Sequence, residues 1–502
     1  MRSNSMYYRQ KLLVTAMTAV FAGSVFAQEQ GEASNIEEIQ VTGSRIRTQT
    51  SMTTPTPVTA VTVSELSTLN PSSTMAEQLD QLPQFFNTQT AQRGGTTFTT
   101  ASGSFLNLRG MGTQRTLVLL DGSRVTPADA GGASNIDNFP TALMQRVDVI
   151  TGGASAAYGA DALAGVVNFV LDREFEGLKT KVSTGITEYG DGDNYNFSVA
   201  GGKSLMDDRL HFIGSLEGRY IDQIVGERDR LDNWNDMGLV QNPAWVSATA
   251  TPNVPRRITV PYVFDNRGSP NGVITTPGFA FTNYTFSEDG KSVRPYQFGQ
   301  YSNSFTNSQS GGAEYNNNVQ AFAFGPDGNE VVQRSVFGAL KYDVTESFSV
   351  RGQIIAGRTE SNTRGLRSQM TIAGSGYAYV IHQENPYLPQ NVRDEMIRTN
   401  RQTILVEKRG QIRVPGRLNS YDDRTNRDIS QMESATVGFD WDVNGNWQVV
   451  GNYQVGKSKV QTGSWNMPRI DEYYLSIDAV TDNTGKIVCK ISTVNPTADQ
   501  LA

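Results

Sequence analysis

Apolar and polar residues alternate in several stretches of the chain beyond residue 177. One such stretch covers residues 209–220, where large apolar residues are separated by polar ones that include His211 and Glu217. Successive side chains of a strand point to opposite faces, so each stretch predicts a strand with one apolar and one polar face. The predicted apolar faces are Leu210, Phe212, Leu216 and Tyr220; Val336, Leu340, Tyr342 and Val344; Phe348, Val350, Ile354 and Ala356; Val437, Phe439, Trp441 and Val443; and Trp447, Val449, Tyr453 and Val455.

The connections between these stretches alternate in length. Residues 202–208, 345–346 and 444–446 form short turns, whereas residues 221–334 and 359–430 are long. Apolar-out strands with short turns at one end and long loops at the other are typical of outer-membrane β-barrels. A soluble β-sandwich has no reason to sort its loops in this way. We therefore predict a mainly β protein with an antiparallel transmembrane β-barrel and long extracellular loops.

The predicted barrel is incomplete. We count seven strands between Leu178 and about Val460, within a barrel region of residues 178–502. A barrel that encloses another domain needs about twenty-two strands. Two open edges in lipid would leave roughly ten backbone polar groups each without partners, at several kcal/mol apiece. We expect the chain to be the N-terminal part of a longer protein.

The first 27 residues have the pattern of a secretory leader. Arg2, Arg9 and Lys11 give a basic start, and an apolar run over Leu12–Phe26 follows it. Small residues near Ala27 favour cleavage after that position. The run is shorter than the ~20 residues that a spanning helix needs, so a membrane anchor is the weaker alternative.

Composition excludes several classes of function. The net charge of −7 comes without a basic patch, so nucleic acid is not an expected partner. The chain has two histidines and none of the zinc-protease, nucleophile-elbow or phosphate-loop motifs. We expect no catalytic site, no metal and no cofactor, and hence no enzyme. His211 lies on the polar face of its strand, where a hydrogen bond toward the lumen is the expected role.

The segment after the leader, residues 28–56, predicts one extended strand followed by a tether. Ile39 and Val41 alternate with polar residues, and the polar sequence around them offers no local pairing partner. Such a strand suits pairing with the sheet edge of another protein. A disordered tail or a first strand of the next domain is the open alternative. Residues 43–57, rich in Thr, Ser and Pro, could span about 50 Å when extended.

Residues 57–177 predict a small α/β domain. Val58–Val63 reads as a strand, and Thr74 and Glu77 have the spacing of a helix capping box. Asp121-Gly122 predicts a tight hairpin between residues 116–120 and 123–125. Further strands are expected at Val147–Ile150 and Val166–Leu171, and a first helical turn tolerates Pro140. Glycines 152, 153, 159 and 165 allow tight turns and close backbone approach.

Two stretches of this domain resemble a known family. LNLRGMGTQRTLVLLDGSRV and VDVITGGASAAYGADALAGVVNFVL are similar to the two signature stretches of the plug domain of TonB-dependent outer-membrane receptors. EEIQVTGSRI resembles the start of mature receptors in that family, where the TonB box lies. The resemblance covers about residues 37–177. It implies a plug inside a barrel of twenty-two strands and import of a scarce ligand with energy relayed by TonB.

The resemblance also implies roles for individual residues. Contact with TonB falls to Glu38, Ile39, Gln40, Val41 and Thr42. Arg109 is expected to face the barrel wall as a paired ion, because a lone charge there would be costly. The plug motif residues are Arg109, Gly110, Asp121, Gly122, Gly152, Gly153, Tyr158, Gly159, Asp161, Gly165 and Asn168.

The expected protein is a monomer in the outer membrane. Its partners are TonB, outer-membrane lipid and a small-molecule or oligosaccharide ligand, such as a ferric siderophore, cobalamin or an oligosaccharide. A passive outer-membrane porin shares the strands and loops but does not need the N-terminal domain. A secreted β-rich binding protein would share the leader and the loops, but it would need strands around a soluble core.

Cys489 is the chain's single cysteine. It follows the seventh predicted strand and is therefore expected in an extracellular loop, where an unpaired thiol is a liability. We expect a disulfide to a second cysteine beyond Ala502. A buried thiol acting as a small apolar residue is the alternative.

Overall fold

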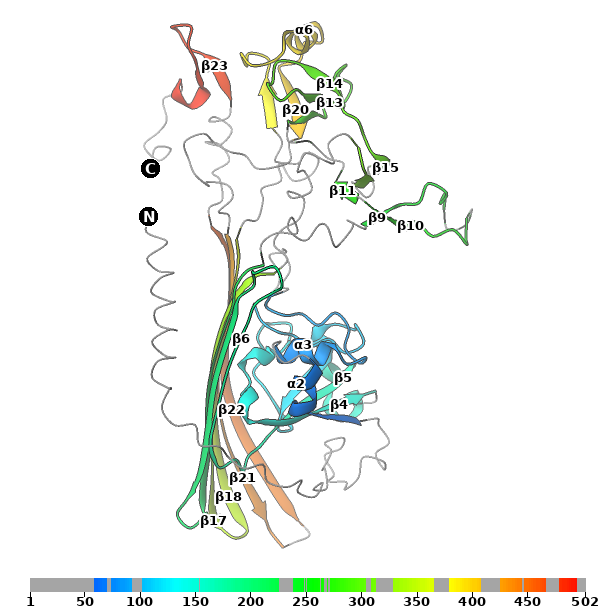
Figure 1. Ribbon diagram of the computed structural model, residues 1–502. Helices are drawn as coiled ribbons and strands as arrows, with labels where there is room; N and C mark the ends of the chain where they lie inside the picture. Colours follow the sequence, from blue (N-terminus) through cyan, green and yellow to red (C-terminus); the bar gives the residue numbers. More distant parts are fainter. Residues whose placement is uncertain are drawn as a thin grey trace.

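The computed structural model describes two bodies of β structure with loops at one end of the larger one (Figure 1). The described residues are 58–69, 74–92, 102–152, 154–224, 238–247, 249, 251–261, 263–265, 269, 271–303, 308–312, 328–364, 379–407, 425–444, 447–465 and 478–493. The leader, the predicted TonB-contact strand at Glu38–Thr42 and Gly153 lie outside these residues.

Residues 58–172 form an α/β domain around a five-stranded sheet of order β1-β4-β5-β2-β3. Strands β2 and β5 are parallel, and the other neighbours are antiparallel. The strands are β1 (Val58–Thr62), β2 (Thr116–Leu120), β3 (Ser123–Arg124), β4 (Met144–Thr151) and β5 (Gly165–Leu171). The helices are α2 (Val63–Leu69), α3 (Met75–Asp80), α4 (Ser155–Tyr158) and the 3-10 helices η2 (Thr113–Arg115), η3 (Ile136–Asn138), η4 (Thr141–Leu143) and η5 (Ala160–Ala162).

Helix caps explain where two of these elements begin. Thr74 and Glu77 form the predicted capping box at the start of α3, each side chain bonding the other's backbone N–H. Thr62 and Glu65 repeat this spacing, and Glu65 accepts from the Thr62 backbone at 2.8 Å. The strand predicted over Val58–Val63 therefore ends at Thr62, because the second cap starts α2 at the next residue.

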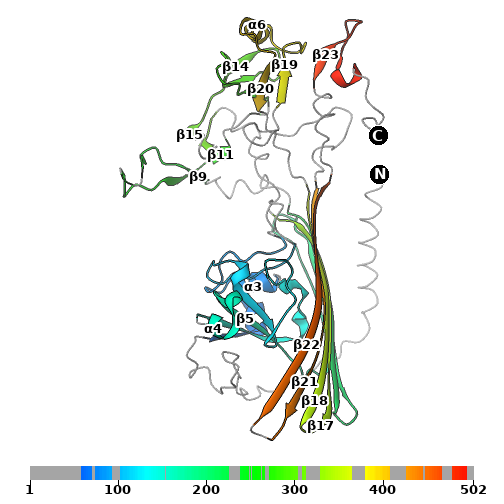
Figure 2. The ribbon, with the colours of Figure 1, turned by 180° about the vertical axis from the view of Figure 1, so that it is seen from behind.

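The second body is the large sheet, a seven-stranded antiparallel sheet of order β22-β21-β18-β17-β8-β7-β6. The number of strands agrees with the seven counted in the sequence. They are β6 (Gly177–Gly185), β7 (Asn194–Leu205), β8 (Leu210–Ile221), β17 (Glu330–Thr345), β18 (Phe348–Arg364), β21 (Thr425–Asp442) and β22 (Gln448–Trp465). Figure 2 shows the sheet from behind, with the α/β domain on one side of it.

The two faces of the large sheet differ as the alternation predicts. Leu216, Ile354 and Val437 are 54%, 58% and 60% exposed on the face that points away from the α/β domain. On the opposite face, Phe337 and Ile355 are buried and belong to the main core of that domain. His211 also makes a hydrogen bond, between Nδ1 and the Ser204 hydroxyl at 3.0 Å. The apolar face is thus outward and unpartnered in this chain, while the other face meets the α/β domain.

Apart from the short connection 186–193, which lies at the end with the long loops, the connections are sorted by length as expected. Residues 206–209, 346–347 and 443–447 connect strands at one end of the sheet, and residues 222–329 and 365–424 at the other (Figure 1). The strands run several residues further than predicted at the loop end, so the long connections are shorter than the sequence suggested. None of the helices in the described part of the chain is long and apolar enough to cross a membrane.

The two long connections fold together above the large sheet (Figure 1). A five-stranded sheet of order β14-β13-β12-β20-β19 takes three strands from the first connection and two from the second. Buried residues from both, including Ile274, Val392 and Ile404, form a separate core. The strands are β9 (Gly238–Gln241), β10 (Arg257–Val260), β11 (Val263–Asp265), β12 (Val273–Ile274), β13 (Tyr284–Phe286), β14 (Val293–Pro295), β15 (Gln300–Asn303), β16 (Ser308–Ser310), β19 (Tyr379–His382) and β20 (Thr403–Glu407), with helix α6 (Gln390–Arg398).

A last hairpin follows the large sheet. It consists of β23 (Ala479–Thr481) and β24 (Ile487–Cys489), followed by the 3-10 helix η9 (Lys490–Ser492). Cys489 is exposed at the end of β24, with a free thiol.

Candidate functional site

The α/β domain is attached to the large sheet mainly through residues 135–142, the contact segment. This segment holds η3 and η4 and lies against strands β7, β17 and β18. Its residues are largely buried, although the sequence NIDNFPTA is rich in polar groups. Buried polar groups need partners, and here the large sheet supplies several of them.

Asn135 organises the start of the contact segment. Its side-chain Oδ1 accepts hydrogen bonds from the backbone N–H of Ser104 at 3.0 Å and of Asp137 at 3.1 Å. Its Nδ2 donates to Thr359 Oγ1 on β18 at 3.4 Å. One side chain therefore caps η3 and ties the domain to the sheet.

Asp137 is the most deeply buried carboxyl group of this interface. The side chain of Gln333 on β17 donates to the Asp137 backbone carbonyl. Burial raises the pKa of the Asp137 carboxyl, although Arg219 and hydrogen bonds from Ser104 act in the opposite direction. The domain therefore carries an acid whose charged form is disfavoured in the assembled state.

Glu217 on β8 makes the most direct link to the contact segment. Its two carboxylate oxygens accept from Thr141 Oγ1 at 2.6 Å and from the Ala142 backbone N–H at 3.0 Å. Lys179 on β6 donates to the Ala142 carbonyl at 3.2 Å. Both the hydroxyl and the backbone of η4 are thus satisfied by the sheet.

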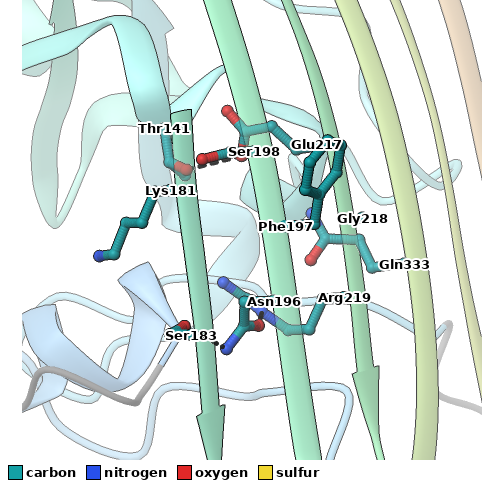
Figure 3. Close-up of a pocket in the computed structure, with 10 residues that line it drawn as sticks. All are labelled: Thr141, Lys181, Ser183, Asn196, Phe197, Ser198, Glu217, Gly218, Arg219 and Gln333. Atoms are coloured by element: carbon teal, nitrogen blue, oxygen red, sulfur yellow. Dashed lines mark hydrogen bonds between the residues drawn. The ribbon is translucent and has the colours of Figure 1, made fainter. Parts of the chain in front are cut away.

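A polar cavity of about 60 Å³ opens beside Glu217 (Figure 3). Arg219 donates to Asn196 at 2.7 Å across it, and Asn196 donates to Ser183 at 3.2 Å. Its lining also includes Thr141, Lys181, Ser198 and Gln333. Ligand pockets are typically ≈300–1,000 Å³, so this cavity holds a few waters rather than a transported molecule. Among the described residues, the one group of side chains with metal-ligand spacing lies outside this interface, near the loop end of the large sheet.

The predicted Asp121-Gly122 hairpin forms a second link to the large sheet. Both residues have positive φ, 48° and 74°, which a tight turn of this kind requires. Asp121 accepts from the Leu171 N–H at 2.8 Å and from Arg173 Nε at 2.7 Å. Arg173 also donates to Gln353 on β18 at 2.6 Å. The hairpin is therefore connected to the sheet through one arginine.

The second signature stretch packs onto the same hairpin. Arg124 pairs with Asp161 at 2.5 Å and donates to the Tyr158 carbonyl at 2.7 Å. The buried side chain of Asn168 accepts from the Gly122 N–H at 2.7 Å. A Cβ on Gly165 would lie 2.3 Å from the Ile150 carbonyl oxygen, so only glycine fits there. Residues predicted from separate motifs thus meet around one turn.

Other predicted residues lie apart from this cluster. Arg109 and Gly110 are exposed and have positive φ, with the Arg109 guanidinium near Gly152. Arg109 forms no ion pair with a described residue, so the predicted pair with the barrel wall stays a prediction. Gly159 adopts a φ of 93° at the end of α4.

Residues 50–166 match the protein family described as the TonB-dependent Receptor Plug Domain. The α/β domain is therefore a TonB-dependent receptor plug domain. Both signature stretches lie within or overlap the matched residues, and the plug is held on the polar face of the large sheet by the contacts above. The fold predicted from the sequence, a plug followed by antiparallel strands, is confirmed.

Three solved structures illustrate what the chain is similar to. The ferric enterobactin receptor PfeA of Pseudomonas aeruginosa is 15% identical, with a TM-score of 0.42, 80% of this chain covered and 41% of that one. The siderophore receptor PiuA of Acinetobacter baumannii is 12% identical, with a TM-score of 0.34 and coverage of 87% and 48%. The alcaligin outer-membrane receptor FauA of Bordetella pertussis is 9% identical, with a TM-score of 0.41 and coverage of 85% and 43%. The chain spans less than half the length of each.

The sequence did not point to the contact segment. Asn135, Asp137 and Gln333 belong to no motif, and their roles come from contacts between residues about two hundred positions apart. Two sequence features could have indicated this contact. Glu217 lies on the predicted polar face of its strand, and the residues around Phe139 and Pro140 are mostly polar, which suggests that these polar groups have partners.

Proposed function

We propose that the chain works in a TonB-dependent outer-membrane receptor that imports a scarce ligand. The observation that carries this proposal is the placement of the plug on the polar face of the large sheet, opposite the apolar face. A passive pore has no use for a folded domain in its lumen. A receptor needs one to close the lumen until energy is supplied.

The outward apolar face supports a place in the outer membrane. Large apolar side chains on most strands of the large sheet, such as Val182, Leu216 and Tyr453, are exposed away from the plug. An apolar surface of this extent is unfavourable in water and favourable against lipid. Short turns then face the periplasm and the long, folded connections face the outside.

Polar contacts that are easy to exchange accompany the apolar packing of Phe337 and Ile355 against the plug. Asn135 and Arg173 donate to side chains of the sheet, and Glu217 of the sheet accepts from Thr141 of the plug. A neutral hydrogen bond of this kind is worth about 0.5–1.5 kcal/mol net and a charged one about 1.5–3 kcal/mol, because water can replace the partner. A pull on the plug can therefore separate these contacts one at a time. In our proposal that pull comes from TonB, through the strand at Glu38–Thr42 and the tether that follows it.

The ligand class follows from the family rather than from a pocket. We infer a ferric siderophore, cobalamin or an oligosaccharide, captured at the loop end of the sheet. In our proposal the capture site is formed by the folded connections that carry β9 to β16, β19, β20 and α6.

Uptake measurements test the proposal. Cells that express the full-length protein are given radiolabelled ferric siderophores, cobalamin and oligosaccharides, with and without TonB. We expect one ligand to be bound in both strains and accumulated only when TonB is present. Accumulation that is independent of TonB and of the proton-motive force would indicate a passive porin and would contradict the proposal.

A further inference from the structure

A group of metal-ligating side chains joins two loops that are far apart in the sequence. His382 is the last residue of β19, Glu384 lies in the turn that follows, and Asp478 directly precedes β23. One ligand atom from each residue lies within 4.8 Å of the others. Nothing in the function proposed above requires this group.

Asp478 is the buried member of the group. Its side chain is 5% exposed, and Oδ2 lies 3.9 Å from His382 Nε2. Among the described residues, no donor makes a hydrogen bond of good geometry to Oδ1 or Oδ2, and Oδ1 has no ion-pair partner either. A buried carboxylate oxygen without a donor is costly, and Oδ1 is therefore open to a further ligand.

Lys490 places positive charge in this group. Its Nζ lies 3.1 Å from Asp478 Oδ2 and 3.2 Å from Glu384 Oε1. The β23–β24 hairpin brings it there, because the Lys490 backbone N–H donates to the Asp478 carbonyl at 2.8 Å. The ammonium is one point charge on a flexible stem, and it leaves the imidazole of His382 and one Asp478 oxygen unused.

We propose that His382, Glu384 and Asp478 bind a divalent transition metal, which displaces the Lys490 ammonium. One imidazole and two carboxylates form a donor set that Zn²⁺ accepts, with water as a fourth ligand. Donor atoms around a tetrahedral Zn²⁺ lie about 3.3 Å apart. The ligand atoms of the three side chains lie within 4.8 Å of one another, so they need to close by up to about 1.5 Å. Glu384 is exposed and His382 is half-buried, so both side chains can rotate toward the ion.

Metal binding here would clamp two loops together. His382 and Glu384 belong to the folded connection that includes β20 and α6, whereas Asp478 belongs to the hairpin after β22. A bound ion would fix that hairpin over the loop end of the large sheet. The metal is a structural ion in this proposal and is distinct from any iron carried by a ligand.

Calorimetric titration of the full-length protein with ZnCl₂ in detergent micelles tests the proposal. We expect saturable binding of one ion. His382→Gln and Asp478→Asn should each weaken Zn²⁺ binding at least 10- to 100-fold. Mutation of a residue that only hydrogen-bonds a metal ligand already lowers metal affinity by that factor. Lys490→Met should tighten binding by about tenfold, because the cation that competes for Asp478 and Glu384 is gone. A gain in affinity cannot result from misfolding.

Matched controls and a second readout complete the test. Asp394→Asn on α6 and Lys486→Met in the β23–β24 turn remove the same charges outside the group and should leave the affinity unchanged. Zn²⁺ should also slow amide exchange over residues 478–493 in the wild type but not in His382→Gln. Absence of saturable binding, equal affinity of His382→Gln and wild type, or no gain in Lys490→Met would overturn the proposal.

Discussion

Asn138 of the plug occupies the space that a side chain at Gly357 of the large sheet would need. A Cβ on Gly357 would lie 2.0 Å from Asn138 Oδ1, which no ordinary packing allows. Gly456 on β22 repeats this relationship with Thr126, at 1.9 Å. The large sheet therefore has two places where the absence of a side chain lets the plug approach the backbone.

Gly357→Ala is expected to weaken the seating of the plug. Overpacking at a tight contact costs about 1–3 kcal/mol, because either the plug or the strand must move. The midpoint of thermal unfolding in detergent, together with protease access to the plug, measures the effect. Gly352→Ala on the same strand is the control, since its Cβ would lie 3.5 Å from Leu340 in ordinary contact. Equal behaviour of the two variants would contradict the role of Gly357.

Glu217→Gln is expected to destabilise the contact segment. A carboxylate accepts from both Thr141 and Ala142, whereas an amide offers one oxygen and no charge, so at least one of the two charge-assisted hydrogen bonds is lost. The loss should be about 1–3 kcal/mol in denaturant unfolding. Glu346→Gln, in the exposed turn between β17 and β18, removes the same charge and should change little. The double variant Glu217→Gln with Thr141→Val should recover part of the loss, and no recovery would point to another cause.

Asp137→Asn is expected to stabilise the protein at neutral pH and to have little effect at acidic pH. Burial raises the pKa of the Asp137 carboxyl in the folded state. The Asp137 carboxyl therefore stabilises the folded protein fully at a pH below its pKa in the unfolded state. This stabilisation is lost as the pH rises through its pKa in the folded state. The asparagine variant avoids this loss, so its advantage over the wild type should grow as the pH rises.

Unfolding midpoints of both proteins at about pH 3 and pH 8, on either side of the ordinary Asp pKa, measure the difference. Asp207→Asn in the exposed turn 206–209 is the control, and it should show no such trend. An advantage of Asp137→Asn that is constant with pH, or that falls as pH rises, would contradict the prediction.

Ile39→Pro is expected to abolish energised uptake while ligand binding persists. Proline removes a strand hydrogen-bond donor and restricts the residue before it, so pairing of this segment with TonB would fail. Uptake of the labelled ligand and its binding to intact cells are measured in parallel. Thr50→Pro, in a tether already rich in proline, is the matched control and should transport normally. Normal transport by Ile39→Pro would rule out the segment as the TonB contact.

The sequence by itself determined the elements that depend on local order. Alternation fixed which face of each long strand is apolar, because a strand has a period of two. The capping box at Thr74 and Glu77 and the turn at Asp121-Gly122 were predictable because a few adjacent residues set the backbone conformation at each place. The signature stretches identified the plug for the same reason, since they encode a compact local fold.

Tertiary structure alone decided the contacts between segments far apart in the chain. Asn135 meets Thr359, Gly357 makes room for Asn138, and Lys490 reaches Glu384, at separations of about one hundred to more than two hundred residues. No local pattern encodes such pairings, because each residue is compatible with its own strand or loop whatever its partner is. The folding together of the two long connections has the same origin: their shared core forms only once the large sheet has brought both to one end.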